Sequence, residues 1–238
     1  MTQILIIFSI ALAPVALIFT YFYFRDKYER EPFIPLIISF VLGAAVAFPV
    51  IAIGDVLANL TGTDDNSGVI GLFFHVLIVI ALAEEGMKYV VLRLYNYNLK
   101  EFDEPYDGIM YAVAVSMGFA ALENILYVYK GGYETGILRM FTAVPAHAAF
   151  ATAMGYFMGL AKFEGQFKNA TWLHLKGLGL AILFHTVYDY IILNKWEELG
   201  ISSAVRLLAF VVLWGGIYYG RKALDFHQEQ SPFKKNGE

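Results

Sequence analysis

The sequence predicts an all-α fold, a polytopic transmembrane helical bundle of about seven or eight helices. Hydrophobic residues make up 58% of the 238-residue chain and charged residues only 16%, whereas soluble domains average about a quarter charged. Apolar segments of about 20 residues, the length that crosses a bilayer as a helix, also follow one another along the chain. These seven segments are about residues 4–24, 33–58, 69–95, 107–129, 136–161, 174–194 and 203–220. The loops between them are short, so we expect residues 1–238 to form a single membrane domain.

Several segments carry local signals of their own. The first has no preceding Lys or Arg and is too long for a secretory signal, so we expect it to persist as a helix. Pro14, Pro49 and Pro145 lie inside the first, second and fifth segments, where each removes a helical hydrogen bond and favours a kink. In the fifth segment, Gly155 and Gly159 permit close approach of another helix.

Basic residues in the loops predict the orientation. Seven spans put the two termini on opposite sides, and about twelve basic residues fall on one side against about four on the other. The larger set comprises Arg25, Lys27, Arg30, Arg93, Lys100, Lys162, Lys168, Lys176, Arg221, Lys222, Lys234 and Lys235. The smaller set comprises Lys130, Arg139, Lys195 and Arg206. By the positive-inside rule, the N-terminus lies outside and the C-terminus in the cytoplasm.

Composition also excludes several classes of function. The net charge is −4 and the basic residues are scattered among short loops, which argues against a nucleic-acid partner. The chain has no cysteine, so disulfides, thiol nucleophiles and cysteine-based metal sites are excluded. It also lacks a Gly-x-Ser-x-Gly elbow and a pair of aspartates in mid-membrane, the marks of other proteolytic classes.

Ionisable groups occur inside the third and fourth segments, where each costs roughly 2.5 to 3.5 kcal/mol and needs a partner or a hydrated cavity. The third segment contains Glu84, Glu85 and Lys88, and the spacing of four stacks Glu84 and Lys88 on one helix face. Adjacent Glu84 and Glu85 differ by about 100° around the helix, so they cannot both face the same pocket. The fourth segment contains Glu123 and Asn124.

Histidines lie in the fifth and sixth segments. His147 comes two residues after Pro145, and His185 with Asp189 forms a second pair on one helix face. From the segment centres, these groups and the glutamates fall within roughly 10 Å of one another in depth. We therefore expect a site inside the membrane, formed by four helices, with a catalytic core of about residues 69–194.

Two chemistries are open for such a site. Glu84 or Glu85 can act as a general base for water, with His147 and His185 orienting it or stabilising an oxyanion. Alternatively, Glu123, His147 and His185 can hold a zinc ion beside a carboxylate base. We prefer the version that requires no cofactor, by a small margin, because the His-Glu-x-x-His signature is absent.

These residues also have non-catalytic explanations. Glu84 and Lys88 can form a structural ion pair, and Asn124 and the histidines can form interhelical hydrogen bonds. The chain could also be a proton-coupled transporter without enzymatic activity. No inverted repeat of the kind found in transporters is apparent. The joint occurrence of all these groups favours an enzyme.

Four motifs, in order, carry a family resemblance. They are Glu84-Glu85-x-x-Lys88, Phe119-x-x-x-Glu123-Asn124, His147 with Gly155 eight residues later, and His185-x-x-x-Asp189. In order and spacing this core resembles the PrsW family of membrane proteases, which is related to CAAX prenyl proteases and bacteriocin-processing proteins. In the prenyl branch the second motif ends in histidine and the fourth in asparagine. Here they end in Glu123 and Asp189, which favours the PrsW branch.

The resemblance implies the roles of the residues. Glu84 and Glu85 match the family's paired glutamates with Lys88 in the same motif, and Glu123, His147 and His185 with Asp189 match the later motifs, with Asn124 in support. It further implies an intramembrane endopeptidase of the bacterial cell membrane, acting on a membrane-anchored protein. The family implies the first cut in an anti-sigma factor, on its extracytoplasmic side.

Overall fold

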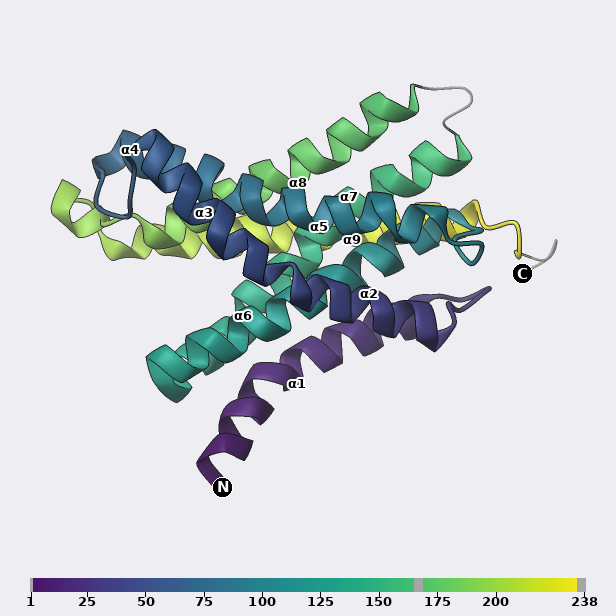
Figure 1. The fold of residues 1–238 in the computed structure, drawn as a ribbon, viewed down its shortest axis with the longest axis horizontal. Coiled ribbons are helices and arrows are strands. Elements are labelled where there is room, and N and C mark those ends of the chain that lie inside the picture. Colours follow the sequence, from purple (N-terminus) through teal and green to yellow (C-terminus); the bar gives the residue numbers. More distant parts are fainter. Residues whose placement is uncertain (1, 165–168, 235–238) are drawn as a thin grey trace.

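The computed structural model describes residues 2–164 and 169–234, and all regular structure in these ranges is helical, as predicted. Figure 1 shows a bundle of elongated helices, most of them running along its longest axis. The longer helices are α1 (Thr2–Arg25), α2 (Phe33–Ala45), α3 (Ala47–Thr61), α5 (Leu82–Leu94), α6 (Pro105–Phe141), α7 (Ala143–Phe163), α8 (Ala170–Leu193) and α9 (Leu208–Glu229). The shorter ones are α4 (Gly68–Phe74), the π-helix η1 (His75–Ala81) and the 3₁₀ turns η2 (Asn96–Asn98), η3 (Trp196–Leu199) and η4 (Ser203–Leu207).

Six helical stretches of the described chain, rather than seven, are long and apolar enough to cross a membrane. The difference arises because α6 and α7 form one stretch, Pro105–Phe163, in which Thr142 separates the two helices and α6 itself is kinked at Gly132, whose φ of 75° is not helical. This stretch contains the predicted segments 107–129 and 136–161. It is folded back on itself, because Gly108 near the start of α6 contacts Gly155 and Gly159 of α7.

The prolines mark two of the helix boundaries. The predicted segment 33–58 is two helices, α2 and α3, which meet at Val46. Pro49 lies three residues later and removes the N–H that would bond to the Ala45 carbonyl. Pro145 lies in the first turn of α7, where the helix does not need its N–H. Helix α1, in contrast, continues through Pro14.

Helix α6 lies at the centre of the bundle, since every residue from Glu104 to Ala121 is buried. Glycines allow its neighbours to approach. A Cβ atom added at Gly43 of α2 would lie 1.9 Å from the Val115 carbonyl oxygen, and one at Gly155 of α7 would lie 2.3 Å from the Gly108 oxygen. One at Gly159 would lie 2.3 Å from the Pro105 oxygen, so the predicted close approach at this glycine pair is confirmed.

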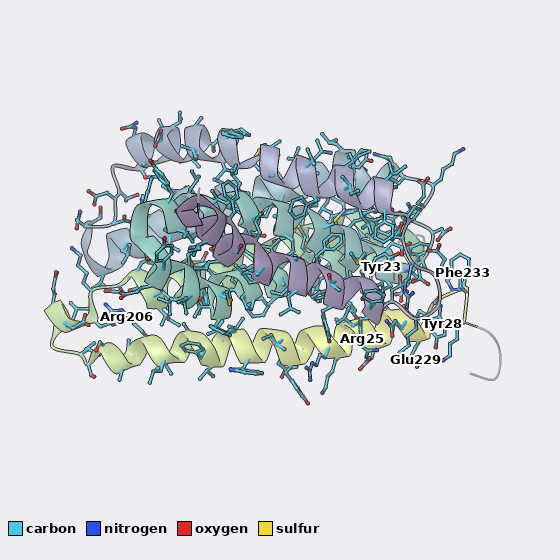
Figure 2. The ribbon with its side chains drawn as sticks, turned by 90° about the horizontal axis from the view of Figure 1, so that it is seen from below. Tyr23, Arg25, Tyr28, Arg206, Glu229 and Phe233 are labelled. Atoms are coloured by element: carbon cyan, nitrogen blue, oxygen red, sulfur yellow. The ribbon has the colours of Figure 1, made fainter. Side chains whose placement is uncertain are left out.

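The end of α1 and the end of α9 meet at one end of the bundle. Arg25 forms an ion pair with Asp225, and Figure 2 shows Arg25 and Glu229 together there, with Arg206 at the opposite end. Helix α9 is longer than the predicted segment 203–220. His227, beyond that segment, is buried against α7, where its Nε2 donates to the Tyr156 carbonyl oxygen at 3.0 Å. Of the basic residues used to predict the orientation, Lys168 and Lys235 lie outside the described residues.

Candidate active site

The polar groups predicted on four helices do come together. Glu84, Glu85 and Lys88 lie in the first two turns of α5, directly after η1. Helix α6 contributes the second acidic group, α7 a histidine from its first turns, and α8 the second histidine with its aspartate. These helices pack around α6 and α7, so the four motifs converge on one site.

Lys88 is the centre of the first contacts. Its Nζ lies 3.1 Å from Glu84 Oε2, 2.8 Å from Glu85 Oε1 and 3.3 Å from His147 Nδ1. The ammonium also lies 4.2 Å from the centroid of the Phe119 ring, and the side chain is only 2% exposed. The lysine therefore forms ion pairs with both adjacent carboxylates, and it links α5 to α7.

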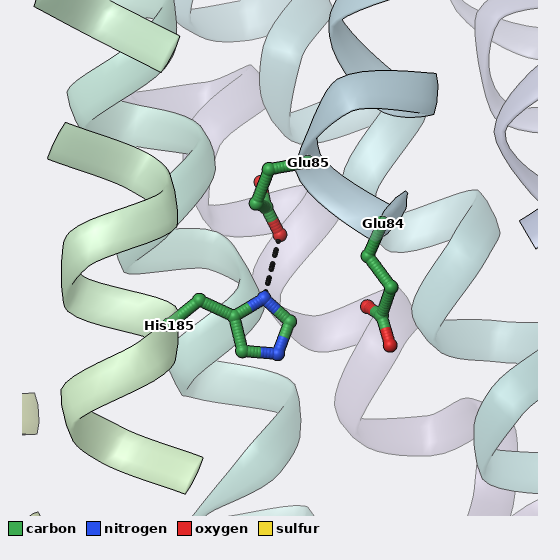
Figure 3. Close-up of side chains that lie close together, drawn as sticks. All are labelled: Glu84, Glu85 and His185. Carbon is green, nitrogen blue, oxygen red and sulfur yellow. Dashed lines mark hydrogen bonds and ion pairs between the residues drawn. The ribbon is translucent and has the colours of Figure 1, made fainter. Parts of the chain in front are cut away.

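His185 is held by a carboxylate on each side. Its Nδ1 lies 3.0 Å from Glu85 Oε1, and its Nε2 lies 3.1 Å from Asp189 Oδ2. Figure 3 shows the first contact crossing from α8 to α5, with Glu84 beside it. Phe150 stacks on the ring at a centroid distance of 4.9 Å. Because both nitrogens face carboxylate oxygens, both can donate only as an imidazolium.

One carboxylate oxygen of Glu123 contacts two side chains, an arginine and a histidine. Its Oε2 lies 2.8 Å from His147 Nε2 and 2.7 Å from Arg139 Nη2. Arg139 Nε donates to Asn124 Oδ1 at 2.6 Å, and Asn124 donates in turn to the Ala11 carbonyl oxygen at 3.0 Å. Asn124 thus ties α6 to α1 and reaches the acidic groups only through the arginine.

Arg139 is the site residue that sequence reasoning missed. The topology prediction counts it among the basic residues of the outer side, yet it lies inside the predicted segment 136–161. An arginine in an apolar segment needs an acidic partner, and that signal could have found it. The structure also defines the partners of His147. Its two ring nitrogens contact Lys88 and Glu123, so it does not serve as an interhelical hydrogen bonder to the backbone.

Two cavities adjoin the site. One of about 390 Å³ lies between α5, α6, α7, α8 and η4 and is lined by Glu84, Glu123, Arg139, His147, His185 and Asp189 among others. A second of about 310 Å³ lies toward α3. Glu84 and Glu123 line both cavities, whereas Glu85 lines neither and is fully buried. Of the two adjacent glutamates, Glu84 is therefore the one that water or a substrate can reach.

The donors of this site suit a transition-metal ion. One ligand atom each from Glu84, Glu85 and His185 lies within 4.8 Å of the others, and all three side chains are buried. Glu85 Oε2 has no hydrogen-bond partner, so it is free to coordinate. Carboxylate and imidazole donors are those of catalytic zinc sites. The grouping differs from the expected set of Glu123, His147 and His185, of which only His185 belongs to it.

Comparisons with known proteins show the family of the chain. A family model described as PrsW family intramembrane metalloprotease matches residues 31–217. Protease PrsW of Geobacillus kaustophilus is 36% identical over 224 residues, covering 94% of each chain. Protease PrsW of Bacillus subtilis is 35% identical over 228 residues, covering 94% of this chain and 98% of its own. No solved structure matches the chain. The chain therefore belongs to the PrsW family and is a membrane-embedded peptidase.

Proposed function

We propose that this protein is an intramembrane endopeptidase that hydrolyses a peptide bond of a membrane-anchored protein, with Glu84 as the base that activates water. The observation that carries the proposal is the shared cavity of Glu84, Glu123, His147 and His185. A water molecule at Glu84 would lie in the same chamber as a scissile carbonyl and the groups that can stabilise its oxyanion.

The charges of the site support this assignment. Lys88, Arg139 and a protonated His185 are three cations, and they face the four carboxylates of Glu84, Glu85, Glu123 and Asp189. One negative charge is left in excess. Glu84 has a single cationic contact, with Lys88, and lines both cavities, so it is the carboxylate best placed to accept a proton from water.

The other side chains have separate tasks. Glu85 joins Lys88 to His185 and keeps both in position. His147 accepts from Lys88 at Nδ1, which leaves Nε2–H to donate to Glu123. His185 and Arg139 are the positive groups on the cavity wall that can stabilise a developing oxyanion.

A metal ion is compatible with these residues. Glu84, Glu85 and His185, the last after losing one ring proton, would hold it, and when bound it would supply Lewis-acid activation of water and of the carbonyl. Cleavage measured with metal-stripped protein distinguishes an enzyme that requires zinc from one that uses only a glutamate and water.

The cavity also suggests where the cut is made. Arg206 and Leu207 of η4 line its wall, and Figure 2 places Arg206 at the end of the bundle away from Arg25. Seven crossings with the basic loops in the cytoplasm would put Arg206 on the outer side. We therefore propose a cut toward the extracytoplasmic side of the bacterial cell membrane, as the first cleavage of a membrane-anchored protein such as an anti-sigma factor.

The test uses purified protein in liposomes with a tagged single-span substrate. Wild type should cleave it, and Glu84→Gln should not, since glutamine keeps the volume and removes the base. Glu134→Gln is the matched control, because Glu134 is exposed on α6 and lines neither of the two cavities. Cleavage by Glu84→Gln at the wild-type rate would overturn the assignment of the base.

A further inference from the structure

A second group of buried acidic side chains lies at the other end of α6. Asp26 follows the last residue of α1, Glu31 lies in the loop to α2, and Glu104 and Asp107 form the capping box of α6. None of the four is more than 1% exposed. Counting 1.5 Å per residue along α6, Glu104 lies about 28 Å from Glu123, so this group is separate from the active site.

The oxygens of these side chains are only partly satisfied. Asp107 Oδ2 accepts from the backbone N–H groups of Asp103 and Glu104 at 2.8 and 2.7 Å, while its Oδ1 has no partner. Glu31 accepts from the Tyr111 hydroxyl through one oxygen, and its carboxyl lies against that of Asp107, where two acceptors can be joined only by a shared proton or a cation. Glu104 accepts from Ser231 through one oxygen, and its other oxygen has no partner.

Asp26 is the clearest case. Neither of its carboxylate oxygens has a hydrogen bond of good geometry, although the Tyr28 backbone N–H lies nearby, and the side chain is 1% exposed. A buried carboxylate without partners carries the full cost of its lost hydration. Burial, and next the neighbouring Glu104 carboxylate, raise the pKa of Asp26 to about 8, and the nearby Tyr28 amide offsets only part of this shift.

The cations nearest to this group in the described chain have other close partners. Arg25 is paired with Asp225. Lys162 of α7 donates to the carbonyl oxygens of Tyr97 and Leu99 at 3.0 and 3.4 Å. Among the described residues, no ion pair within 4.0 Å involves any of the four carboxylates. The group therefore has carboxylate oxygens without partners and no close ion pair, so a bound cation could be coordinated there.

We propose that Asp26, Glu104 and Asp107 bind a hard divalent cation, Ca²⁺ or Mg²⁺, at the end of the bundle where α1 and α9 meet. One oxygen from each of the three lies within 4.8 Å of the others. A second grouping, of Glu29, Glu31 and Asp107, meets the same criterion and shares Asp107 with the first.

The chemistry of the donors selects the ion. All are carboxylate oxygens, which suit Ca²⁺ and Mg²⁺ rather than the nitrogen and sulfur sites of zinc. Three buried carboxylates resemble the protein cage that Ca²⁺ accepts, whereas Mg²⁺ usually keeps several waters. Ca²⁺ is therefore the stronger candidate, with Mg²⁺ as its competitor.

The ion would tie together parts of the chain that are far apart in sequence. Asp26 belongs to the α1–α2 loop and Glu104 to the start of α6, while Ser231 donates to Glu104 from the segment after α9. The Gln228 side chain also donates to the Arg25 carbonyl oxygen. Figure 2 shows Tyr28 and Phe233 at this same end of the bundle. A bound cation would stabilise this junction without touching the reacting atoms.

Binding can be measured on the full chain in detergent after treatment with a chelator, by titrating CaCl₂ and MgCl₂ in a calorimeter. Wild type should bind Ca²⁺, and Asp26→Asn should bind it about tenfold more weakly or not at all, because one carboxylate ligand is lost. Glu101→Gln is the matched control, since Glu101 is exposed close to Glu104 in the chain, and it should bind like wild type. Glu85→Gln should also bind like wild type, which separates this site from the active site.

Three results would overturn the proposal. These are no binding of either ion by wild type at millimolar concentration, equal binding by Asp26→Asn, or loss of binding in Glu85→Gln instead. If Asp26→Asn does not fold, the melting temperature of wild type decides. Ca²⁺ should then raise it well above the effect of NaCl at the same ionic strength, and an equal effect of the two salts would contradict a specific site. Each result stands whether or not the protein cleaves a substrate.

Discussion

Replacing each of the two adjacent glutamates by glutamine is expected to affect different properties of the protein, namely the cleavage rate for Glu84 and the stability for Glu85. Glu84 has one cationic contact, at 3.1 Å, and lines both cavities. Glu84→Gln keeps an amide oxygen for Lys88, so we expect a stability loss of only about 1 kcal/mol. A general base contributes about 10²–10⁴-fold to a rate. Cleavage should therefore fall by at least about 100-fold while the protein remains folded.

Glu85→Gln removes a different function. Glu85 is fully buried and contacts both Lys88 and His185, at 2.8 and 3.0 Å. Breaking a buried ion pair costs about 3–5 kcal/mol because the partner is left uncompensated. Here Lys88 keeps Glu84 and His185 keeps Asp189, so we expect the lower value, about 3 kcal/mol. At about 2–4 °C per kcal/mol, the melting temperature should fall by about 6–12 °C.

Both quantities can be measured on the same preparations. A fluorescent fusion heated in detergent gives the melting temperature, and cleavage of a tagged substrate in liposomes gives the rate at matched protein concentration. The reasoning would be refuted if Glu84→Gln stayed within tenfold of the wild-type rate, or if Glu85→Gln melted at the wild-type temperature. In the first case the base lies elsewhere, and in the second the buried network contributes nothing to stability.

Topology, metal dependence and the role of Arg139 can each be tested separately. Single cysteines introduced at Asp64 and Lys162 should react with impermeant reagents from opposite sides of the membrane, and labelling from the same side would disprove the proposed topology. If zinc is required, metal-stripped protein should be inactive and added zinc should restore cleavage. By elemental analysis, His185→Ala should then contain about one equivalent of metal less than wild type. Full activity of verified metal-free protein would exclude this requirement. Arg139→Gln should lower cleavage about tenfold or more, because Glu123 loses its 2.7 Å contact, and an unchanged rate would show that the contact positions nothing.

Much of the site could be predicted because the membrane makes ionisable residues conspicuous. Glu84, Glu123, His147 and His185 stand out in apolar segments, and the i, i+4 rule placed Asp189 beside His185, where the structure has it at 3.1 Å. The depth estimate was sufficient to expect convergence. It could not supply the rotation of each helix about its axis. That rotation places the Lys88 ammonium between His147 and the two glutamates, whereas the sequence had suggested a metal ion bound by Glu123, His147 and His185.

The buried acids at the other end of α6 were not predicted, and the reason is also physical. Asp26, Glu31 and Glu104 fall in segments that the hydropathy pattern assigns to loops, and loop carboxylates are usually solvated. Their burial depends on α9 continuing to Glu229 and on Ser231 reaching Glu104. Such a contact joins positions more than a hundred residues apart, and periodicity within one segment carries no information about it.

The π-helix η1 shows why the choice between Glu84 and Glu85 required the structure. Each residue of an α-helix turns the chain by about 100°, and that is also the angle between these two side chains. One π-helical turn holds one residue more than an α-helical turn, so the π segment rotates α5 by a comparable angle relative to α4. A continuous α-helix from α4 through α5 would therefore direct a different face toward α6 and α7. The apolar composition of His75–Ala81 is compatible with either helix, so the sequence predicts that one glutamate faces the cavity without selecting Glu84.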